Sequence, residues 1–196
     1  MNKQEKNWSH KFGVAYTKRN KNIKKPYLIK LIFKKIKSIN SVFEFGTNIG
    51  NNLDIIKKIN KKILTYGVEI NKYACQKAQK KGHNVINSSI FKLKNPLQKY
   101  DLTFTYGVLI HINPRNLKQI YEKLFKFSKK YILIIEYISE QPSKIIYRGK
   151  KDLLFSRDFA KEVKNKYKLK IIDYGFMWSE DKKNTIGNHH WFLFKK

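Results

Sequence analysis

Residues 41–52 read Ser-Val-Phe-Glu-Phe-Gly-Thr-Asn-Ile-Gly-Asn-Asn, and this stretch decides the fold. Its first five residues form a short apolar run typical of a buried strand, and apolar residues at helical spacing follow from 53 to 59. Gly46 and Gly50 lie between the two patterns. Glycine lets the chain turn tightly after a strand, and the next helix begins with unpaired N–H groups. The stretch therefore predicts a strand, a turn that can hold a nucleotide-like ligand, and a helix.

The next strand adds a second signal. Residues 64–70 form another apolar run, which places Glu69 about 20 residues beyond the turn, where a carboxylate can accept both ribose hydroxyls. The turn itself differs from the dinucleotide fingerprint, because Asn48 replaces the middle glycine, and it lacks the lysine–threonine pair of a P-loop. Together the two signals predict a nucleoside site, with a solvated or helix-capping Glu69 as the alternative.

Strands and helices alternate along the rest of the chain. After a polar opening segment we expect helices over 26–39, 53–59, 72–81, from 113 onward and over 156–166, and strands over 41–45, 64–70, 84–86, 100–105, 131–137, 169–176 and 191–194. Residues 138–155 are expected to be irregular. This alternation predicts an α/β, three-layer, doubly wound and mostly parallel sheet. Because the chain ends on two strands joined by a polar loop, we expect seven strands with an antiparallel last strand.

Composition limits the class of protein. A length of 196 residues with 41% hydrophobic residues is enough for one folded domain. Cys75 is the single cysteine, which excludes a disulfide framework or a multi-cysteine metal site within one chain and favours a cytoplasmic setting. The longest apolar run, 131–138, is far shorter than the roughly 20 residues that cross a bilayer, so we expect no membrane span.

The formal charge of +29 invites a nucleic-acid interpretation, because clustered lysine and arginine bind phosphates. Only four of the 43 basic residues are arginine, however, and the lysines are spread over nearly every predicted helix. Guanine recognition and bidentate phosphate binding favour arginine. We therefore expect a solvated basic surface and keep nucleic-acid binding as the second interpretation.

A third signal follows the strand at 100–105. Asp101 opens this strand, and Gly107, His111 and an Asn113-Pro114 helix start come after it. The order of the three signals matches class I methyltransferases that use S-adenosylmethionine (SAM). The cofactor-binding candidates on this layout are Glu44, Gly46, Asn48, Gly50, Glu69, Ile70, Ser89 and Gly107. Ser89 follows the strand after which many such enzymes carry an acidic residue for the adenine amino group, so Ser88, Ser89 or backbone groups take that role.

Longer strings resemble one family more closely. EFGTNIGNN (44–52), GVEIN (67–71), YGVLIHINP (106–114), YRG (147–149) and LFSRDFA (154–160) resemble the pseudaminic acid biosynthesis-associated methylase family, from about residue 8 onward. The resemblance implies a class I methyltransferase linked to bacterial nonulosonic acid or glycan modification. We expect residues 1–25 to cap the cofactor site and residues 26–196 to form the methyltransferase domain.

The catalytic candidates follow the two central strands. His111 is the first candidate for a general base toward a sugar hydroxyl, because the ordinary pKa of histidine is near the working pH. Glu136 is the alternative base, and Tyr137 is a candidate substrate ligand in the same crevice at the carboxyl ends of the strands. Packing roles for His111 and Glu136 are the alternatives.

Two of the four arginines are candidates for binding the acceptor. Arg148 and Arg157 can grip a carboxylate or phosphate of an acidic or nucleotide-linked sugar through a bidentate fork. Ion pairs with Asp152, Asp158 or Glu162 are the alternative. We expect no metal site at His189 and His190, because no acidic partner lies near them in sequence, and we interpret both as surface or lid residues.

These observations predict SAM-dependent methyl transfer to a small or glycan-linked sugar acid or its precursor. One alternative is the same chemistry on RNA. A second is a SAM-binding partner protein in a glycan pathway that has no catalytic activity. Both a monomer and a dimer agree with the sequence.

Overall fold

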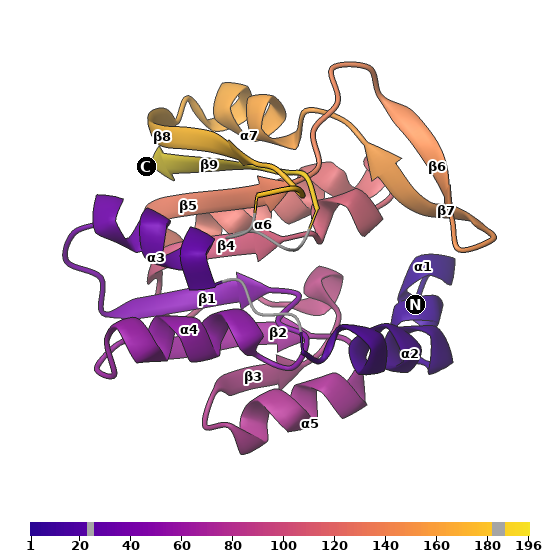
Figure 1. Cartoon of the computed structure of the whole chain (residues 1–196), viewed down its shortest axis with the longest axis horizontal. Coiled ribbons are helices and arrows are strands. Elements are labelled where there is room, and N and C mark those ends of the chain that lie inside the picture. The colour runs from indigo at the N-terminus through magenta and orange to yellow at the C-terminus, as the bar shows by residue number, and fades with distance from the viewer. Residues whose placement is uncertain (23–25, 182–186) are drawn as a thin grey trace. The chain divides into compact units, whose positions relative to one another are not determined.

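The computed structural model describes residues 1–22, 26–181 and 187–196, and it divides into two compact units, Met1–Lys94 and Asn95–Lys196. Figure 1 labels the helices and strands. The first unit contains α1 (Lys3–Ser9), α2 (Lys11–Asn20), α3 (Pro26–Lys35), β1 (Ser41–Phe45), α4 (Asn51–Ile59), β2 (Leu64–Glu69), α5 (Lys72–Lys80), β3 (Asn84–Asn87) and the 3-10 turn η1 (Ile90–Lys92). The second contains β4 (Tyr100–Tyr106), the 3-10 turns η2 (Leu109–His111) and η3 (Pro114–Asn116), α6 (Leu117–Phe127), β5 (Ser128–Glu136), β6 (Ser143–Tyr147), β7 (Lys150–Ser156), α7 (Phe159–Tyr167), β8 (Lys170–Met177) and β9 (His189–Lys195).

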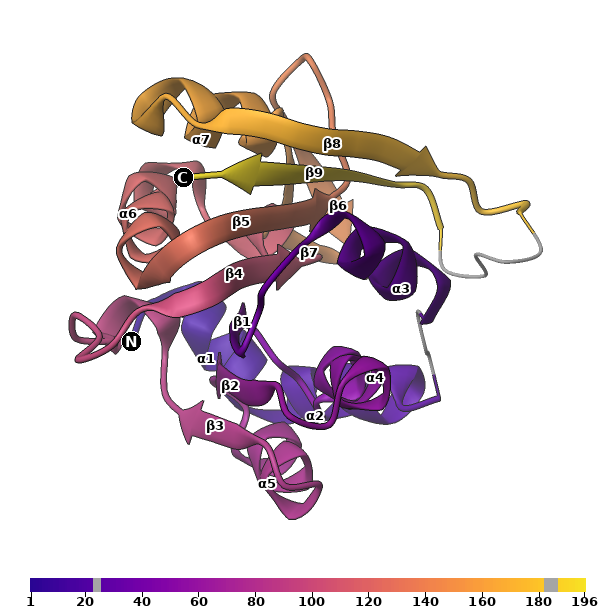
Figure 2. The ribbon, with the colours of Figure 1, turned by 90° about the vertical axis from the view of Figure 1, so that its left-hand side faces the viewer.

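Seven strands form one mostly parallel sheet. In the first unit β3, β2 and β1 are parallel neighbours in that order. In the second unit β4 is parallel to β5, and β9 is antiparallel both to β5 and to β8. Figure 2 shows β8 running alongside β9. The predicted α/β sheet with an antiparallel last strand is therefore confirmed.

The first unit folds around apolar residues at strand and helix spacing. β1 buries its residues from Val42 to Phe45, and α4 and α5 turn their apolar faces inward and pack against this set of strands (Figure 1). Cys75 is fully buried on α5, and burial raises the pKa of its thiol to about 11. This agrees with a packing cysteine and not with a nucleophile, because the thiol stays protonated at neutral pH.

The opening segment is helical, which the sequence analysis did not predict. α1 begins with a capping box, in which the Asn2 side chain accepts from the Glu5 N–H at 2.9 Å and the Glu5 carboxylate accepts from the Asn2 N–H at 2.6 Å. Trp8 packs edge-on against Phe12 and Tyr16, with ring centroids 5.1 and 5.3 Å away. These three aromatic rings, spaced four residues apart, form an aromatic stripe across α1 and α2. Many polar residues lie between them, so the sequence shows no clear helical pattern of apolar residues here.

Residues 143–156 form a β-hairpin, so most of the stretch that was expected to be irregular is regular structure. β6 and β7 are antiparallel, and Arg148 and Gly149 connect them with φ angles of 49° and 71° (Figure 1). Two left-handed residues are typical of a tight type I′ turn, in which Asn-Gly is usual at these positions. Because Arg148 occupies the first of these two positions, the sequence lacks the Asn-Gly pair that would have predicted a hairpin.

Several predicted boundaries were also wrong. α7 begins at Phe159, with the Asp158 side chain accepting from the Lys161 N–H at 2.8 Å, so Asp158 and not Ser156 caps this helix. α3 ends at Lys35, four residues before the predicted end, and β5 begins at Ser128. Within the described ranges, no helix combines the length and the apolar character that crossing a bilayer requires.

Candidate functional site

The turn after β1 has a left-handed backbone at three positions. Gly46, Asn48 and Gly50 have φ angles of 76°, 49° and 77°. Asparagine tolerates this conformation better than other residues with a side chain, and the Asn48 side-chain oxygen also accepts from the Ile49 N–H at 2.8 Å. Gly50 has a second constraint, because a Cβ there would lie 2.7 Å from Cδ2 of His83. The predicted glycine turn is therefore present, and it leads directly into α4.

The Glu69 carboxylate braces this turn. Its Oε2 accepts from the Asn48 N–H at 2.7 Å, and its Oε1 accepts from the Asn71 N–H at 2.8 Å. Burial raises the pKa of Glu69, while the backbone N–H groups act in the opposite direction. A carboxylate can accept about four hydrogen bonds, and the Ile70 N–H also acts on this one, so capacity remains for a hydroxyl group of a ligand. Ile70, another cofactor-binding candidate, lies between Glu69 and Asn71 in the chain.

Three residues from α4 and the end of α5 hold the turn from the other side, and we call Asp54, Lys81 and His83 the turn clamp. Lys81 Nζ donates to the Ile49 carbonyl and to Asp54 Oδ2, both at 2.7 Å. His83 Nε2 bonds Asp54 Oδ1 at 2.9 Å, and its Nδ1 bonds Thr65 Oγ1 at 2.9 Å. Because a carboxylate only accepts, the His83 proton lies on Nε2 and the Thr65 hydroxyl donates to Nδ1.

Burial lowers the pKa of His83, and the hydrogen bond to Asp54 only partly offsets this shift. The turn clamp could not be predicted from the sequence, because Lys81 and His83 lie 27 and 29 residues from Asp54 and no pattern of spacing connects them.

Two further predicted cofactor residues are buried and engaged locally. Glu44 Oε1 accepts from the Asn52 side chain at 2.6 Å, which links β1 to α4. The Ser89 hydroxyl accepts from the Phe91 N–H at 3.1 Å and caps η1. Gly107 belongs to the second unit, has a φ angle of 64° and donates its N–H to the Ile135 carbonyl at 2.9 Å.

Asn71 connects the opening helices to the strand end that carries Glu69. Its side-chain nitrogen donates to the carbonyls of Trp8 at 3.0 Å and His10 at 3.3 Å, while its side-chain oxygen accepts from the Ala74 N–H and caps α5. The opening segment is thus attached next to Glu69, the candidate residue for binding a ribose. That residues 1–25 cap a cofactor stays a prediction, and residues 23–25 lie outside the described ranges.

His111 lies in η2, directly after β4, and is bonded to the β6–β7 hairpin. Its Nδ1 donates to the Leu153 carbonyl at 2.7 Å, and its ring lies 5.3 Å from the ring of Tyr147. A carbonyl only accepts, so the proton lies on Nδ1 and Nε2 carries the lone pair. Burial lowers the pKa of His111 to about 4. The imidazole is therefore neutral at pH 7, in a tautomer that can accept a proton at Nε2.

Glu136, at the end of β5, holds the turn that carries His111. Its Oε1 accepts from the N–H groups of Val108 and Leu109, each at 2.9 Å, and its Oε2 accepts from the Ile110 N–H at 3.5 Å. Burial raises the pKa of Glu136 to about 7, although these N–H groups lower it. The carboxyl group titrates near neutral pH, and its contacts are those of a residue that positions η2.

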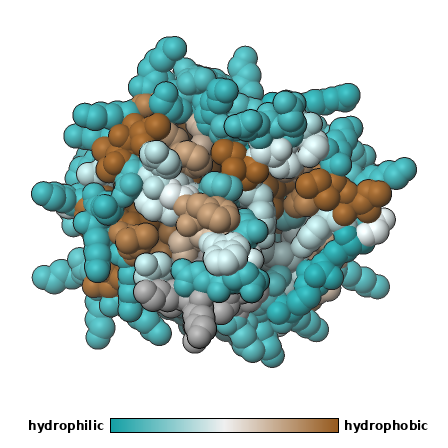
Figure 3. Space-filling view, turned by 45° about the horizontal axis from the view of Figure 1, so that its top comes forward, coloured by the Kyte–Doolittle hydropathy of each residue, from teal (hydrophilic) through white to brown (hydrophobic). Residues whose placement is uncertain are grey.

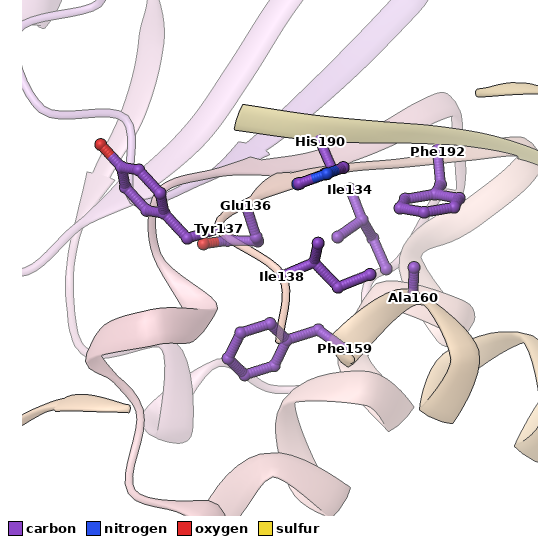
Figure 4. A pocket seen from close by; sticks show the side chains of 8 residues that line it. All are labelled: Ile134, Glu136, Tyr137, Ile138, Phe159, Ala160, His190 and Phe192. Carbon is purple, nitrogen blue, oxygen red and sulfur yellow. The ribbon is translucent and has the colours of Figure 1, made fainter. Parts of the chain in front are cut away.

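Glu136 and Tyr137 also line a small cavity in the second unit. The cavity has a volume of about 10 Å³, roughly the space of one water molecule. Figure 4 shows the side chains that surround it, which are Ile134, Glu136, Tyr137, Ile138, Phe159, Ala160, His190 and Phe192. The Tyr137 ring points away from the others and lies 4.4 Å from the ring of His189.

His189 and His190 are the first two residues of β9, which differs from the expectation of surface or lid residues before the last strand. His189 is buried. His190 lies opposite Glu136 in the β5–β9 register, and its Nδ1 is buried with no hydrogen-bond partner among the described residues. Burial lowers the pKa of His190, and the charge of Asp158 only partly offsets this shift. Only the strand register, which sequence spacing does not give, brings His190 beside Glu136.

The two candidate arginines have different surroundings. Arg157 Nε donates to Glu162 Oε1 at 2.6 Å, and Glu162 Oε2 accepts from the Tyr121 hydroxyl at 2.7 Å. This is one of the ion pairs considered as an alternative. Arg148 is exposed at the tip of the hairpin, with its guanidinium 5.9 Å from the centre of the Tyr147 ring. A non-glycine residue in this backbone conformation costs roughly 1–2 kcal/mol.

The described part of the chain contains no cluster of three or more His, Cys, Asp or Glu side chains that could hold a metal ion. The structure thus brings Gly46, Asn48, Gly50 and Glu69 together around one turn, while Ser89 caps η1. In the second unit it connects His111, Glu136 and the hairpin that carries Arg148.

Comparisons with known proteins support the fold. The chain matches no family model, and no curated protein matches it. Among solved structures, a SAM-dependent methyltransferase from Leishmania major aligns with a TM-score of 0.67 and 17% identity, covering 85% of this chain and 71% of that chain. A 1,6-didemethyltoxoflavin N1-methyltransferase from Burkholderia thailandensis, with S-adenosylhomocysteine bound, has a TM-score of 0.73 and 11% identity, covering 93% and 84%.

A SAM-dependent methyltransferase from Archaeoglobus fulgidus has a TM-score of 0.69 and 14% identity, covering 95% of this chain and 100% of that chain. The chain therefore has the fold of class I SAM-dependent methyltransferases. The comparisons do not support the narrower pseudaminic acid family.

Proposed function

We propose that this chain is a SAM-dependent methyltransferase whose first unit binds the cofactor. The observation that carries the proposal is the buried Glu69 carboxylate, which is hydrogen bonded to the Asn48 N–H of the glycine turn. A carboxylate in this position, with acceptor capacity left, fits a hydroxyl group of a ribose. The solved structures with this fold, some with S-adenosylhomocysteine bound, support the same assignment.

Residues of the turn have separate roles in this proposal. Gly46 and Gly50 give the backbone its left-handed turn, which lets a ligand approach the chain closely. Glu69 accepts from the ribose, and the turn clamp keeps the Ile49 carbonyl and the start of α4 in place. When bound, SAM supplies a methyl group attached to a positively charged sulfur.

We propose an acidic sugar, free or glycan-linked, or its precursor as the methyl acceptor. Arg148 supports this class, because an exposed guanidinium at the tip of a hairpin can bind a carboxylate or phosphate through two parallel hydrogen bonds. The strings around Arg148 and Arg157 are also those that resemble the nonulosonic acid methylases. The +29 charge favours an anionic acceptor in general.

His111 acts as the proton acceptor in this reaction. With SAM held by Glu69 and the glycine turn, methyl transfer to an acceptor hydroxyl would break the bond between the methyl carbon and the sulfur and release S-adenosylhomocysteine. Nε2 of His111 would take the hydroxyl proton, which becomes strongly acidic during the transfer. A histidine with a pKa of about 4 can take such a proton late in the transfer, while Glu136 and Leu153 keep the ring in position. The reaction depends mainly on the alignment of the two reactants.

Calorimetric titration of the full chain with S-adenosylhomocysteine tests cofactor binding. Glu69→Ala should weaken binding by about 1.5 to 3 kcal/mol, the range for a hydrogen bond to a charged group. Glu122→Ala is the matched control, because that carboxylate pairs with Lys126 on the exposed face of α6. Equal affinity of the Glu69 variant and the wild type would refute the ribose assignment, and a wild type that does not bind would refute the function.

Methyl transfer from radiolabelled SAM tests the acceptor. His111→Ala should leave affinity for S-adenosylhomocysteine intact and reduce turnover by roughly 10² to 10⁴-fold with an acidic sugar or its nucleotide conjugate. RNA serves as the competing acceptor. Labelling of RNA but not of sugars would favour the RNA alternative, and binding of the cofactor without any transfer would favour a non-catalytic partner protein.

A further inference from the structure

The two opening helices, α1 and α2, bury few apolar side chains. Their buried residues are Glu5, Gly13 and Thr17, and none of these has a large apolar side chain. Hydrophilic side chains, drawn in teal, likewise predominate on the face of the molecule in Figure 3, where the brown hydrophobic ones lie in separate groups. A segment with few buried apolar contacts opens locally at a small cost in free energy. Hydrogen bonds to the rest of the first unit should therefore decide whether these helices stay docked.

Asn71 holds the corner between the two helices. Its side-chain nitrogen donates to the carbonyl of Trp8, in the last turn of α1, at 3.0 Å and to the carbonyl of His10, just before α2, at 3.3 Å. The peptide N–H of Asn71 donates to Glu69 Oε1 at 2.8 Å. One asparagine therefore contacts both the opening helices and the candidate residue for binding a ribose.

Gly13 lets the corner close on Asn71. A Cβ at position 13 would overlap the Trp8 carbonyl oxygen and would lie 2.8 Å from the Asn71 side-chain nitrogen. The first of these atoms belongs to the backbone of α1 and the second donates the hydrogen bonds that hold the corner. Any residue larger than glycine would therefore push the opening helices away from Asn71.

A second asparagine holds the other end of α2. The Asn51 side-chain nitrogen donates at 3.2 Å to the carbonyl of Lys21, which directly follows α2. Asn51 is the first residue of α4 and comes after Gly50, and its side-chain oxygen accepts from Lys81 of the turn clamp at 3.0 Å. α2 is thus attached beside Glu69 at one end and beside the glycine turn at the other (Figure 1).

We propose that Asn71 and Asn51 are positioning residues that couple the docking of α2 to the binding of a cofactor at Glu69. The proposal rests on the proposed function, in which Glu69 accepts from the ribose of SAM. Docking of the helices fixes the Asn71 side chain and, with it, the N–H that orients the Glu69 carboxylate. A ribose bound to Glu69 fixes the same carboxylate from the ligand side. Each event therefore lowers the entropy cost of the other, and the coupling is equal in both directions.

Hydrogen exchange and calorimetric titration of the full chain with S-adenosylhomocysteine test the coupling. In the wild type, saturating ligand should slow amide exchange in α1 and α2 about five- to tenfold. Asn71→Ser keeps a good N-cap for α5, but its side chain is too short to reach the carbonyls of Trp8 and His10. This variant should exchange faster in both helices without ligand, bind the ligand about five- to tenfold more weakly, and show no slowing when the ligand binds.

Gly13→Ala breaks the same corner from the side of α2. Alanine favours a helix more than glycine does, so faster exchange in this variant would come from lost docking and not from a weaker helix. It should weaken binding as Asn71→Ser does, and the double variant should bind no more weakly than either single variant. Asn20→Ser is the matched control, because the Asn20 side chain bonds the Tyr16 carbonyl within α2. The control should match the wild type in both measurements.

Asn51→Asp tests the other end of α2. The aspartate can still accept from Lys81, but it cannot donate to the Lys21 carbonyl. Exchange at the end of α2 should become faster, and the ligand should bind more weakly than to the wild type.

The outcomes separate this coupling from the proposed function. A wild type that does not bind S-adenosylhomocysteine would overturn both. Binding that leaves exchange in α1 and α2 unchanged would overturn the coupling alone, as would an affinity that Asn71→Ser and Gly13→Ala leave intact. Losses that add up in the double variant, or a control that loses as much affinity as Asn71→Ser, would also overturn it.

Discussion

Glu136 and His111 should give the stability of this protein two opposing dependences on pH. Burial raises the pKa of Glu136 from 4.5 to about 7, so its contribution to stability is fully present below pH 4.5 and is lost as the pH rises through 7. Burial lowers the pKa of His111 from 6.5 to about 4, so its contribution is present above pH 6.5 and is lost as the pH falls through 4. Each difference of about 2.5 corresponds to about 3 kcal/mol, and the two effects largely cancel between pH 4.5 and 6.5.

Glu136→Gln separates the two effects. The amide oxygen can still accept from the backbone N–H groups of η2, but the side chain no longer titrates. The free energy of unfolding of this variant should rise by about 2 kcal/mol from pH 5 to pH 7.5, because His111 is left unopposed. In His111→Gln the amide can still donate to the Leu153 carbonyl. The free energy of unfolding of this variant should fall by about 2 kcal/mol over the same pH range. The wild type and the double variant should change by less than about 1 kcal/mol.

Urea unfolding at constant ionic strength, followed by tryptophan fluorescence and circular dichroism, measures these free energies. Glu122→Gln on the exposed face of α6 is the control for removing a carboxylate without burial. If Glu136→Gln keeps the pH dependence of the wild type, the backbone N–H groups outweigh burial and Glu136 is ionised throughout. Burial would then not be the dominant influence on the pKa of Glu136.

Three further predictions concern the turn, the core and the hairpin. Lys81→Met removes the clamp on the Ile49 carbonyl and should weaken S-adenosylhomocysteine binding about tenfold in calorimetry, and unchanged affinity would show that the turn keeps its shape without it. Phe159→Ala should cost about 3–5 kcal/mol in urea unfolding, because Phe159 is 1% exposed, and a loss below about 1 kcal/mol would contradict a tightly packed core. Arg148→Asn should raise the melting temperature slightly, since asparagine suits the left-handed turn, and should raise KM for an acidic acceptor more than it lowers kcat. An unchanged KM would remove Arg148 from the acceptor site.

Much of the fold could be predicted because burial leaves a periodic pattern. The apolar run at 41–45 and the helical spacing after it correctly predicted β1 and α4, and the same reasoning located β2, α5, β4 and α6. The glycine turn and Glu69 were predicted for a related reason, since a left-handed turn and a strand-end carboxylate each require particular residue types. The β6–β7 hairpin was missed, because Arg148 occupies a turn position where asparagine is usual.

The sequence by itself determined the class of fold and the order along the chain of the sheet strands and of helices α3 to α7, but not the opening helices or the β6–β7 hairpin. Only the tertiary structure decided the hydrogen-bond partners of the buried polar residues. Periodicity reports which face of a strand or helix is buried, whereas a hydrogen bond depends on distances between segments far apart in the chain. Glu136 accepts from N–H groups 26 to 28 residues away, and His83 reaches Asp54 across 29 residues. Backbone N–H groups are present at every residue except proline, so no residue type in the sequence marks which of them a buried carboxylate will bind.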